Sequence, residues 1–269
     1  NPRMKAIILA AGRGSRLWPL TADCPKCLLR LGAESNADTI LEHQIGNLRH
    51  AGLQQIVFVC GFGVDMVRSA IEGCAGGTGI DVKVLYNPFY TVSDNLISLW
   101  AGRSEMDGDF LLLNGDNVFD ASLLRPLLTG QEPICLTVAS KPSYNDDHMR
   151  VQIEGDRIVR IGKHIPDACT DAASVGVMRF SGTGTGLMRN MLESAVSERR
   201  ALSRNFPHTI QRLIDAGHKV AYRHTTLPCI DVDTPADLEA ARGLATTLAP
   251  ASSMPSRPAP MVDEQRVAS

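Results

Sequence analysis

Two glycines and two cations lie close together near the start of the chain and could hold a phosphate group. Gly12 and Gly14 follow an apolar run, and Arg16 and Lys26 come shortly after them. Small residues let backbone N–H groups approach a phosphate closely, and fixed cations neutralise its charge. The stretch has neither the third glycine of a dinucleotide-binding fingerprint nor the Gly-Lys-Ser/Thr of a P-loop. We therefore predict a nucleoside triphosphate site of another kind, covered by a loop that runs from Arg16 to Lys26.

Two acidic segments far apart in the chain could hold a divalent metal ion. Asp116 follows the apolar run 110–113, and ligands of open α/β sheets bind beyond the carboxyl ends of such strands. Asp231 and Asp233 form the second segment and would face the same side of a strand. Both segments also have a structural interpretation, since Asn, Gly and Asp favour turns, and Asp233 or Thr234 could cap the helix that follows. A carboxylate near a phosphate loop is well placed to bind Mg²⁺.

The hydrophobic pattern predicts an α/β protein in which these segments follow the strands of a mostly parallel sheet flanked by helices. Apolar runs alternate with helical periodicity, as in βαβ units, and a fully apolar run such as 110–113 fits a sheet covered on both faces. Strands are predicted at 6–9, 56–60, 82–86, 110–113, 134–139 and 175–180, with a hairpin of 150–154 and 157–161. Helices are predicted at 41–51, 64–72, 96–104, 121–128, 187–197, 206–215 and 236–244.

One domain is predicted to cover residues 4–248. Its nucleotide-binding half extends over 4–140, and its acceptor-binding half covers 141–248, where the hairpin changes the pattern. Residues 249–269 are rich in Pro, Ser and Ala and show no periodicity, so we expect a flexible tail or linker there.

The segment 5–31 resembles the signature of the nucleoside-triphosphate transferases, or nucleotidyl-sugar pyrophosphorylases. It reads KAIILAAGRGSRLWPLTADCPKCLLRL and departs visibly only at Cys27, where that family usually has a small or apolar residue. The resemblance implies a Rossmann-like mixed α/β fold and Mg²⁺-dependent transfer of a nucleotidyl group onto a phosphate. It assigns Arg16 and Lys26 to the triphosphate. It places these loop residues beside the nucleotide: Leu9, Ala10, Ala11, Gly12, Arg13, Gly14 and Ser15.

The same resemblance implies metal and acceptor roles further along the chain. Asp116 aligns with a family Gly-Asp whose carboxylate binds the metal. Asp231 aligns with a second metal ligand, and Asp233 stands where many members have glycine, so either carboxylate could reach the ion. Lys163 resembles a lysine that holds the acceptor phosphate, although a solvated surface lysine is the alternative. Because the acceptor oxygen is already ionised, positioning is the main contribution, and no general base is required.

The segment 86–100 indicates which nucleotide is used. Sugar-nucleotide enzymes usually have a Pro-x-Gly stretch here, whereas this chain has Asn95 before Leu-Ile-Ser-Leu. That pattern resembles the cytidylyltransferases that act on phosphocholine, inositol phosphate or phosphonates, so we predict CTP and place Asn95 beside the nucleotide. The alternative is a helix cap formed by Ser93, Asp94 or Asn95.

The sequence is compatible with several acceptors. Choline would require an aromatic cage, but only 5% of the residues are aromatic, and Tyr144 is the single ring besides His148 in the expected acceptor loop. Asp146 and Asp147 could bind an amine or hydroxyl groups, or could be solvated. The run 149–163 looks closer to inositol-phosphate and phosphonate cytidylyltransferases. Phosphocholine, inositol phosphate, aminoethylphosphonate and sugar phosphates remain the candidates.

Composition and charge exclude some classes of binding partner. The formal net charge of −2 provides no basic field for nucleic acid, and no run is long and apolar enough to span a membrane. Seven irregularly spaced cysteines include one C-x-x-C pair and no second pair at zinc spacing, which favours reduced thiols and a cytoplasmic protein. A homodimer is one option for its assembly. A sugar-1-phosphate uridylyl- or guanylyltransferase and a non-catalytic nucleotide-binding regulator are the competing functions.

Overall fold

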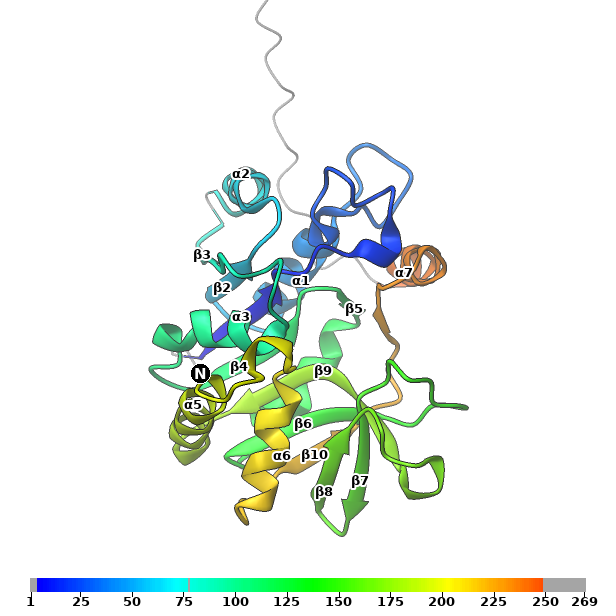
Figure 1. The fold of residues 1–269 in the computed structure, drawn as a ribbon. Helices are drawn as coiled ribbons and strands as arrows, with labels where there is room; N and C mark the ends of the chain where they lie inside the picture. Colours follow the sequence, from blue (N-terminus) through cyan, green and yellow to red (C-terminus); the bar gives the residue numbers. More distant parts are fainter. Residues whose placement is uncertain (1–3, 77, 249–269) are drawn as a thin grey trace, which may run out of the picture.

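A central sheet with helices on both faces forms the fold of the computed structural model, which describes residues 4–76 and 78–248 (Figure 1). The strands are β1 Lys5–Ala10, β2 Gln55–Cys60, β3 Asp81–Tyr86, β4 Phe110–Asn114, β5 Asn117–Phe119, β6 Ile134–Ala139, β7 Arg150–Glu154, β8 Arg157–Gly162, β9 Ala172–Phe180, β10 Ala221–His224 and β11 Cys229–Asp231. The helices are α1 Ile40–His50, α2 Val64–Ala75, α3 Asn95–Ala101, α4 Arg125–Thr129, α5 Thr183–Val196, α6 Pro207–Asp215 and α7 Pro235–Thr247. This architecture confirms the predicted mixed, mostly parallel α/β fold.

The main sheet has nine strands, seven of which follow the order β10-β6-β9-β4-β1-β2-β3, with the β7–β8 hairpin attached at β9. β1 pairs in parallel with β2 and β4, whereas β9 runs antiparallel to β4 and β6. β5 and β11 form a separate two-stranded antiparallel sheet. Because Leu9 is in register with Asn114, the carboxyl ends of β1 and β4 meet at one edge of the sheet, and the candidate site lies there.

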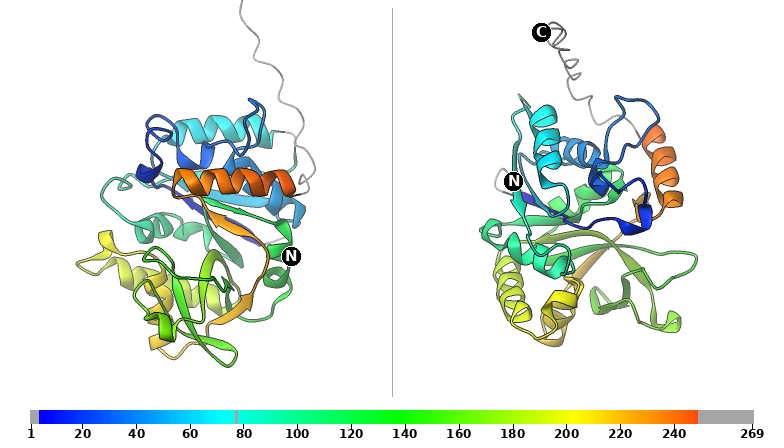
Figure 2. Two further views of the ribbon diagram at one scale, coloured as in Figure 1. Left: turned by 90° about the vertical axis from the view of Figure 1, so that its right-hand side faces the viewer. Right: turned by 45° about the horizontal axis from the view of Figure 1, so that its top comes forward.

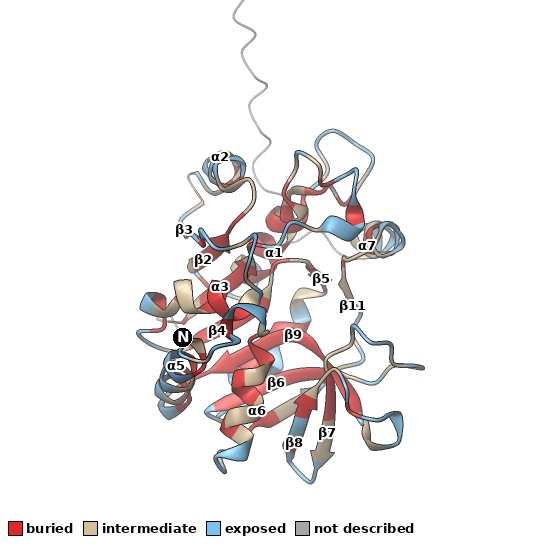
Figure 3. Cartoon of the chain, in the orientation of Figure 1, coloured by how far each residue is buried: buried red, intermediate tan, exposed pale blue. Residues whose placement is uncertain are grey.

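Alternate residues of β1 pack into two different cores. Ile7 and Leu9 belong to an apolar cluster that includes residues of α3, α5 and α6. Ala6 and Ile8 belong to a cluster that includes residues of α1 and α2. Successive side chains of a strand point to opposite faces, so this strand is covered on both sides, and Figure 3 shows the same burial for its neighbours in the sheet. The loops at the strand ends therefore start from a fully packed base.

Helix α7 brings the end of the described chain back to the loop that follows β1. Thr234 and Asp237 form a capping box at its start, which confirms the predicted helix cap, and Pro235 occupies the first turn. Leu238 of this helix belongs to a third apolar cluster together with Leu17 of the loop. The two segments lie near each other in both views of Figure 2. The acidic segment before α7 is therefore held beside the glycine loop.

The predicted elements are observed with small shifts and three omissions. The predicted helix 121–128 consists of a 3₁₀ turn, Ala121–Leu124, followed by α4. The predicted helix 96–104 ends at Ala101 and continues as a 3₁₀ turn, Arg103–Glu105. β5, β10 and β11 are not predicted, because three or four residues are too few to show a period. The predicted tail, 249–269, lies outside the described residues. Within 4–76 and 78–248, no helix combines the length and hydropathy needed to cross a bilayer.

Candidate active site

The end of β1, from which the glycine loop starts, lies against the turn that follows β4. The Gly115 N–H donates a hydrogen bond of 2.8 Å to the Leu9 carbonyl, and a Cβ on Gly115 would lie only 2.7 Å from that oxygen. Gly14 has a φ of 64°, in the left-handed region that glycine adopts freely. A Cβ on Gly12 would meet no atom within 4 Å. The backbone of this loop is therefore accessible from the open side of the sheet edge, as a phosphate site requires.

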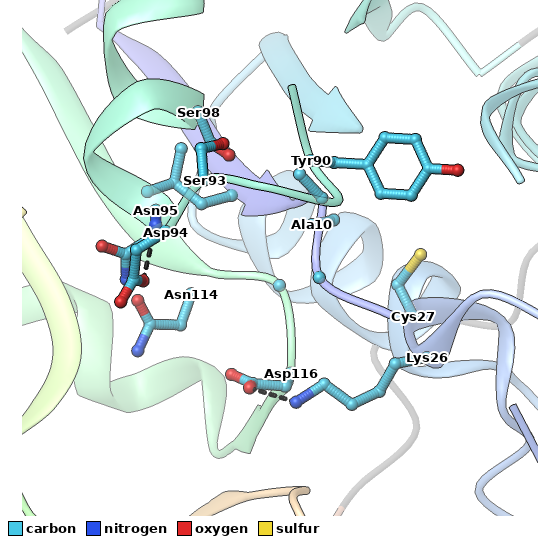
Figure 4. A pocket seen from close by; sticks show the side chains of 14 residues that line it. Ala10, Lys26, Cys27, Tyr90, Ser93, Asp94, Asn95, Ser98, Asn114 and Asp116 are labelled. Atoms are coloured by element: carbon cyan, nitrogen blue, oxygen red, sulfur yellow. Dashed lines mark hydrogen bonds and ion pairs between the residues drawn. The ribbon is translucent and has the colours of Figure 1, made fainter. Parts of the chain in front are cut away.

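A cavity of about 240 Å³ lies beside this loop (Figure 4). Residues 9–12, 26–27, 93–95 and 114–116 line it, together with Tyr90 and Ser98. The structure thus gathers the predicted nucleotide-binding residues Leu9, Ala10, Ala11, Gly12, Lys26, Asn95 and Asp116 around one cavity. The other predicted loop residues, Arg13, Gly14 and Ser15, follow this lining in the chain, and the Arg13 guanidinium lies over the Phe62 ring at 5.1 Å.

Lys26 connects the two acidic segments. Its Nζ lies 2.6 Å from Asp116 Oδ2 and 2.9 Å from Asp233 Oδ1, although these residues are 90 and 207 positions away in the chain. Burial alone would lower the pKa of Lys26, but the charges of Asp116 and Asp233 outweigh it and shift this pKa upward. The lysine is therefore a fixed positive charge at the mouth of the glycine loop.

Arg16 continues the charged row toward the acceptor half. Its two terminal nitrogens lie 3.1 Å from Asp233 Oδ2 and 2.6 Å from Asp147 Oδ2. Lys163 Nζ lies 3.6 Å from the other oxygen of Asp147. Cations and carboxylates thus alternate in the order Lys26, Asp233, Arg16, Asp147 and Lys163. Asp147 bridges Arg16, which is predicted to bind the triphosphate, and Lys163, which is predicted to bind the acceptor phosphate.

Asp116 and Asp231, the two carboxylates predicted to bind a divalent cation, line one cavity. Asp116 Oδ1 is buried without a hydrogen-bond partner. Asp231 accepts a hydrogen bond from Asn117 Nδ2, and burial together with the nearby Asp116 charge raises the pKa of Asp231 to about 7. Among the described residues, no group of three or more His, Cys, Asp or Glu could hold a metal ion. Two carboxylates are nevertheless enough for Mg²⁺, which usually takes its remaining ligands from water and substrate phosphates.

Asp233 faces the same space as Asp231, although it lies beyond the end of β11. Both residues line a second cavity of about 200 Å³ together with Asp116 and Lys163. Burial would raise the pKa of Asp233, but the charges of Lys26 and Arg16 outweigh it and lower this pKa. The carboxylate of Asp233 therefore has direct ion pairs with protein cations, whereas the charge of Asp231 is offset only in part, by lysines with which it forms no ion pair.

Asn95 joins the nucleotide side to the acceptor side. Asp94 caps α3, because its side chain accepts from the Asn95 N–H. The Asn95 Oδ1 accepts a 2.7 Å hydrogen bond from the Phe206 N–H, just before α6. Asn95 also lines both cavities. Its contact with a nucleotide stays a prediction.

The predicted acceptor loop divides into residues that face the site and residues that shape the loop. Asp147 meets Arg16 and Lys163, as described above. The Tyr144 hydroxyl accepts from the Lys141 N–H and donates to the Asp171 carbonyl, both at 3.4 Å. Asp146 is exposed. Acceptor contacts by Tyr144 and Asp146 stay predictions.

Several site residues were not among the predicted ones. Lys141 follows β6 and lines a third cavity with Asp231, whose negative charge it partly offsets. Asn114 ends β4 and lines the first two cavities. The buried Gln44 amide donates to the carbonyls of Asn114 and Asn117 and so holds this turn. Lys141 and Asn114 both lie at carboxyl ends of strands, which was a usable signal. Nothing near Gln44 in the sequence indicated its role.

Comparisons with known proteins identify relatives of this chain. A family model for the MobA-like NTP transferase domain matches residues 6–149. A CMP-5′-(3-aminopropyl)phosphonate synthase of Streptomyces rubellomurinus is 35% identical over 141 residues, which cover 52% of this chain and 21% of that protein. A bifunctional IPC transferase and DIPP synthase of Rubrobacter xylanophilus is 31% identical over 247 residues, which cover 87% of this chain and 50% of that protein. The chain thus spans half or less of the length of these relatives.

A solved structure extends the likeness of fold to nearly the whole described chain. The inositol-1-phosphate CTP transferase from T. maritima matches with a TM-score of 0.74 and 22% identity, over 92% of this chain and 98% of that one. The family match itself includes the glycine loop, Lys26 and Asp116, which are the residues that meet in the first cavity. On this evidence, the chain belongs to the family of MobA-like NTP transferase domains.

Proposed function

We propose that this chain is an Mg²⁺-dependent nucleotidyltransferase that joins a nucleoside triphosphate, with CTP favoured, to a small phosphorylated or phosphonylated acceptor and releases pyrophosphate. One observation carries the proposal. Lys26 lies between Asp116 and Asp233 beside the glycine loop, and Asp231 lines one cavity together with these two carboxylates. A cation, paired carboxylates and accessible backbone N–H groups are the parts that phosphoryl transfer needs.

The reaction would be a single in-line displacement. An ionised acceptor oxygen forms a bond to the α-phosphorus while the bond from that phosphorus to the β-phosphate oxygen breaks, and pyrophosphate leaves with that electron pair. Lys26 and Arg16 would neutralise the triphosphate, and Lys163 would orient the acceptor. A bound Mg²⁺ at Asp116 and Asp231 would supply charge neutralisation at the phosphate oxygens. No residue needs to remove a proton, because the attacking oxygen already carries the charge.

The preference for CTP rests on a resemblance and on two kinds of relative. Asn95 before Leu-Ile-Ser-Leu resembles cytidylyltransferases, and the names of the Streptomyces relative and of the T. maritima structure refer to CMP and CTP. A sugar-1-phosphate uridylyl- or guanylyltransferase is the competing enzyme, and a non-catalytic regulator is the competing binding protein. The cytoplasmic location and the homodimer stay predictions.

A matrix of substrates tests the proposal. Pyrophosphate release is measured with CTP, UTP, GTP and dTTP against phosphocholine, inositol phosphate, aminoethylphosphonate, phosphonocarboxylates and sugar phosphates, each with Mg²⁺ and with EDTA. We expect turnover with CTP and at least one acceptor, and its loss in EDTA. Preference for UTP or GTP with a sugar phosphate would favour the competing enzyme. Nucleotide binding without turnover of any acceptor would favour the regulator.

A further inference from the structure

A fourth cavity, lined by Lys163 and Arg204, adjoins the candidate acceptor site. It has a volume of about 260 Å³ and lies between the end of β8 and the start of α6. Its lining shares Met149, Lys163, Asn205 and Pro207 with the lining of the cavity that contains Asp116 and Asp231. Lys163 therefore stands at the junction of the two spaces. A ligand whose phosphate lies at Lys163 can extend its other end into this fourth cavity.

The charged side chains that line this fourth cavity are all basic. Lys163, His164, Arg204 and His208 line it, and no Asp or Glu appears among the described residues of its lining. The first turn of α6 also lines it, and the amino end of a helix carries a partial positive charge. The carboxylates that contact these side chains, Asp147 at 3.6 Å from Lys163 and Glu198 at 3.6 Å from His208, are not part of this lining.

Arg204 is the cation in the lining of this cavity whose charge is least neutralised by carboxylates. Its side chain is half-buried and its Nε is buried without a hydrogen-bond partner. Within the described part of the chain, no carboxylate forms an ion pair with it, whereas Glu198 is shared between His208 and Arg212. An arginine in this state has its planar donors available, and these donors match a carboxylate or a phosphate.

We propose that the acceptor carries a second anionic group, a carboxylate being the simplest, which this cavity binds through Arg204. This inference deepens the proposed function, because it takes Lys163 as the holder of the acceptor phosphate or phosphonate. An acceptor that ends in an ammonium group would instead meet Lys163 and Arg204 with no facing carboxylate, which disfavours it. A phosphonocarboxylate or phosphocarboxylate is therefore the class of acceptor that this surface fits.

Direct binding measurements test the inference independently of turnover. Isothermal titration compares 3-phosphonopropionate and 4-phosphonobutyrate with propylphosphonate, butylphosphonate and 2-aminoethylphosphonate on the full chain with Mg²⁺. We expect at least one carboxylate probe to bind about tenfold or more tightly than its alkyl counterpart, as a charge-assisted hydrogen bond predicts. We expect the ammonium probe to bind no better than the alkyl probes. Equal affinities, tighter binding of the ammonium probe, or no measurable binding of the carboxylate probes would overturn the inference.

Variants assign the preference to one side chain. Arg204→Gln should remove the carboxylate preference and leave alkylphosphonate affinity unchanged, Arg204→Lys should retain part of the preference, and the exposed Arg199→Gln should behave as the wild type. Unchanged melting temperatures identify variants that fold. A preference that persists in a folded Arg204→Gln variant would refute the role of this residue. A carboxylate preference in binding with no pyrophosphate release from any substrate pair would refute the proposed function and uphold only the anion site at Arg204.

Discussion

The two sides of the candidate site use their cations differently. On the nucleotide side, Lys26 and Arg16 each contact two carboxylates. In the cavity beyond Lys163, Arg204 has no ion-pair partner among the residues that the structure describes. Phosphates that bind on the nucleotide side must therefore compete with internal carboxylates, whereas an anion beside Arg204 gains a contact without displacing one. The ion pairs of Lys26 and Arg16 favour precise positioning of a bound phosphate, whereas Arg204 favours ligands that carry a negative charge.

The nucleotide side itself contains a fixed part and an exchangeable part. The side chains of Lys26 and Asp116 are 15% and 19% exposed, whereas those of Arg16 and Asp147 are 50% and 54% exposed. Exposed ion pairs contribute only about 0–1 kcal/mol, because water screens them and ordering long side chains costs entropy. Lys26 and Asp116 are therefore held in place, while Asp147 can release Arg16 at little cost. The following substitutions test this gradient.

The largest effect is expected at Asp116, the proposed metal ligand in the fixed part. Asp116→Asn should lower the rate of pyrophosphate release about 10²–10³-fold or more, since it removes charge from the point where the transition state is stabilised. The melting temperature should stay close to that of the wild type, because the amide keeps the size of the side chain. The exposed Asp81→Asn serves as the control. Activity like that of the wild type in Asp116→Asn would contradict a role for this carboxylate.

Loss of the central cation should come next. Lys26→Ala removes the group that contacts Asp116 and Asp233, so Asp116 would lose its ion-pair partner and Asp233 would keep only Arg16. More negative charge would then face the incoming triphosphate. We expect a rise in KM for the nucleotide and a fall in kcat that together lower kcat/KM at least about tenfold to a hundredfold. Steady-state kinetics over a range of nucleotide concentrations measure both. An unchanged kcat and KM would remove Lys26 from the site.

A smaller effect of opposite sign is expected in the exchangeable part. Asp147→Asn releases Arg16 and reduces its competition for phosphate, so the Kd for the nucleotide should fall by up to about fivefold. Titration calorimetry with the nucleotide and Mg²⁺ detects such a change, and Asp146→Asn on the same loop is the matched control. Weaker nucleotide binding in Asp147→Asn would mean that this carboxylate supports the bound state and does not compete with it.

The smallest effect on chemistry is expected at the helix that follows Asp233. Thr234→Ala breaks the capping box of α7 and should lower the free energy of unfolding by about 1 kcal/mol. A melting temperature lower by about 2–4 °C, with nearly unchanged kcat, would match this structural role. Thr247→Ala, at the other end of the helix, should change the melting temperature less. A large loss of kcat would show that the cap also positions Asp233.

The helices and strands that could be predicted are those whose sequence pattern lies within the element itself. The apolar run 110–113 corresponds to β4, and the periodic run 41–51 corresponds to α1 within one residue at each end. Thr234 caps α7, as the proline that follows it indicated. The glycine loop was readable for the same reason, because a strand, small residues and cations follow each other directly. β11 was missed, since its pairing partner β5 lies more than a hundred residues earlier and each is only three residues long.

Residue order and local chemistry were thus enough for the class of fold, the position of the glycine loop and the family. Only the folded chain decided which charges meet. The pairing of β11 with β5 brings Asp231 to Asn117, and Lys26 contacts Asp233 across 207 positions. The fold also places Arg204 in the lining of a cavity whose described residues include no carboxylate. Such contacts depend on how distant strands and helices pack, and no local propensity encodes the distance between two side chains that many elements separate.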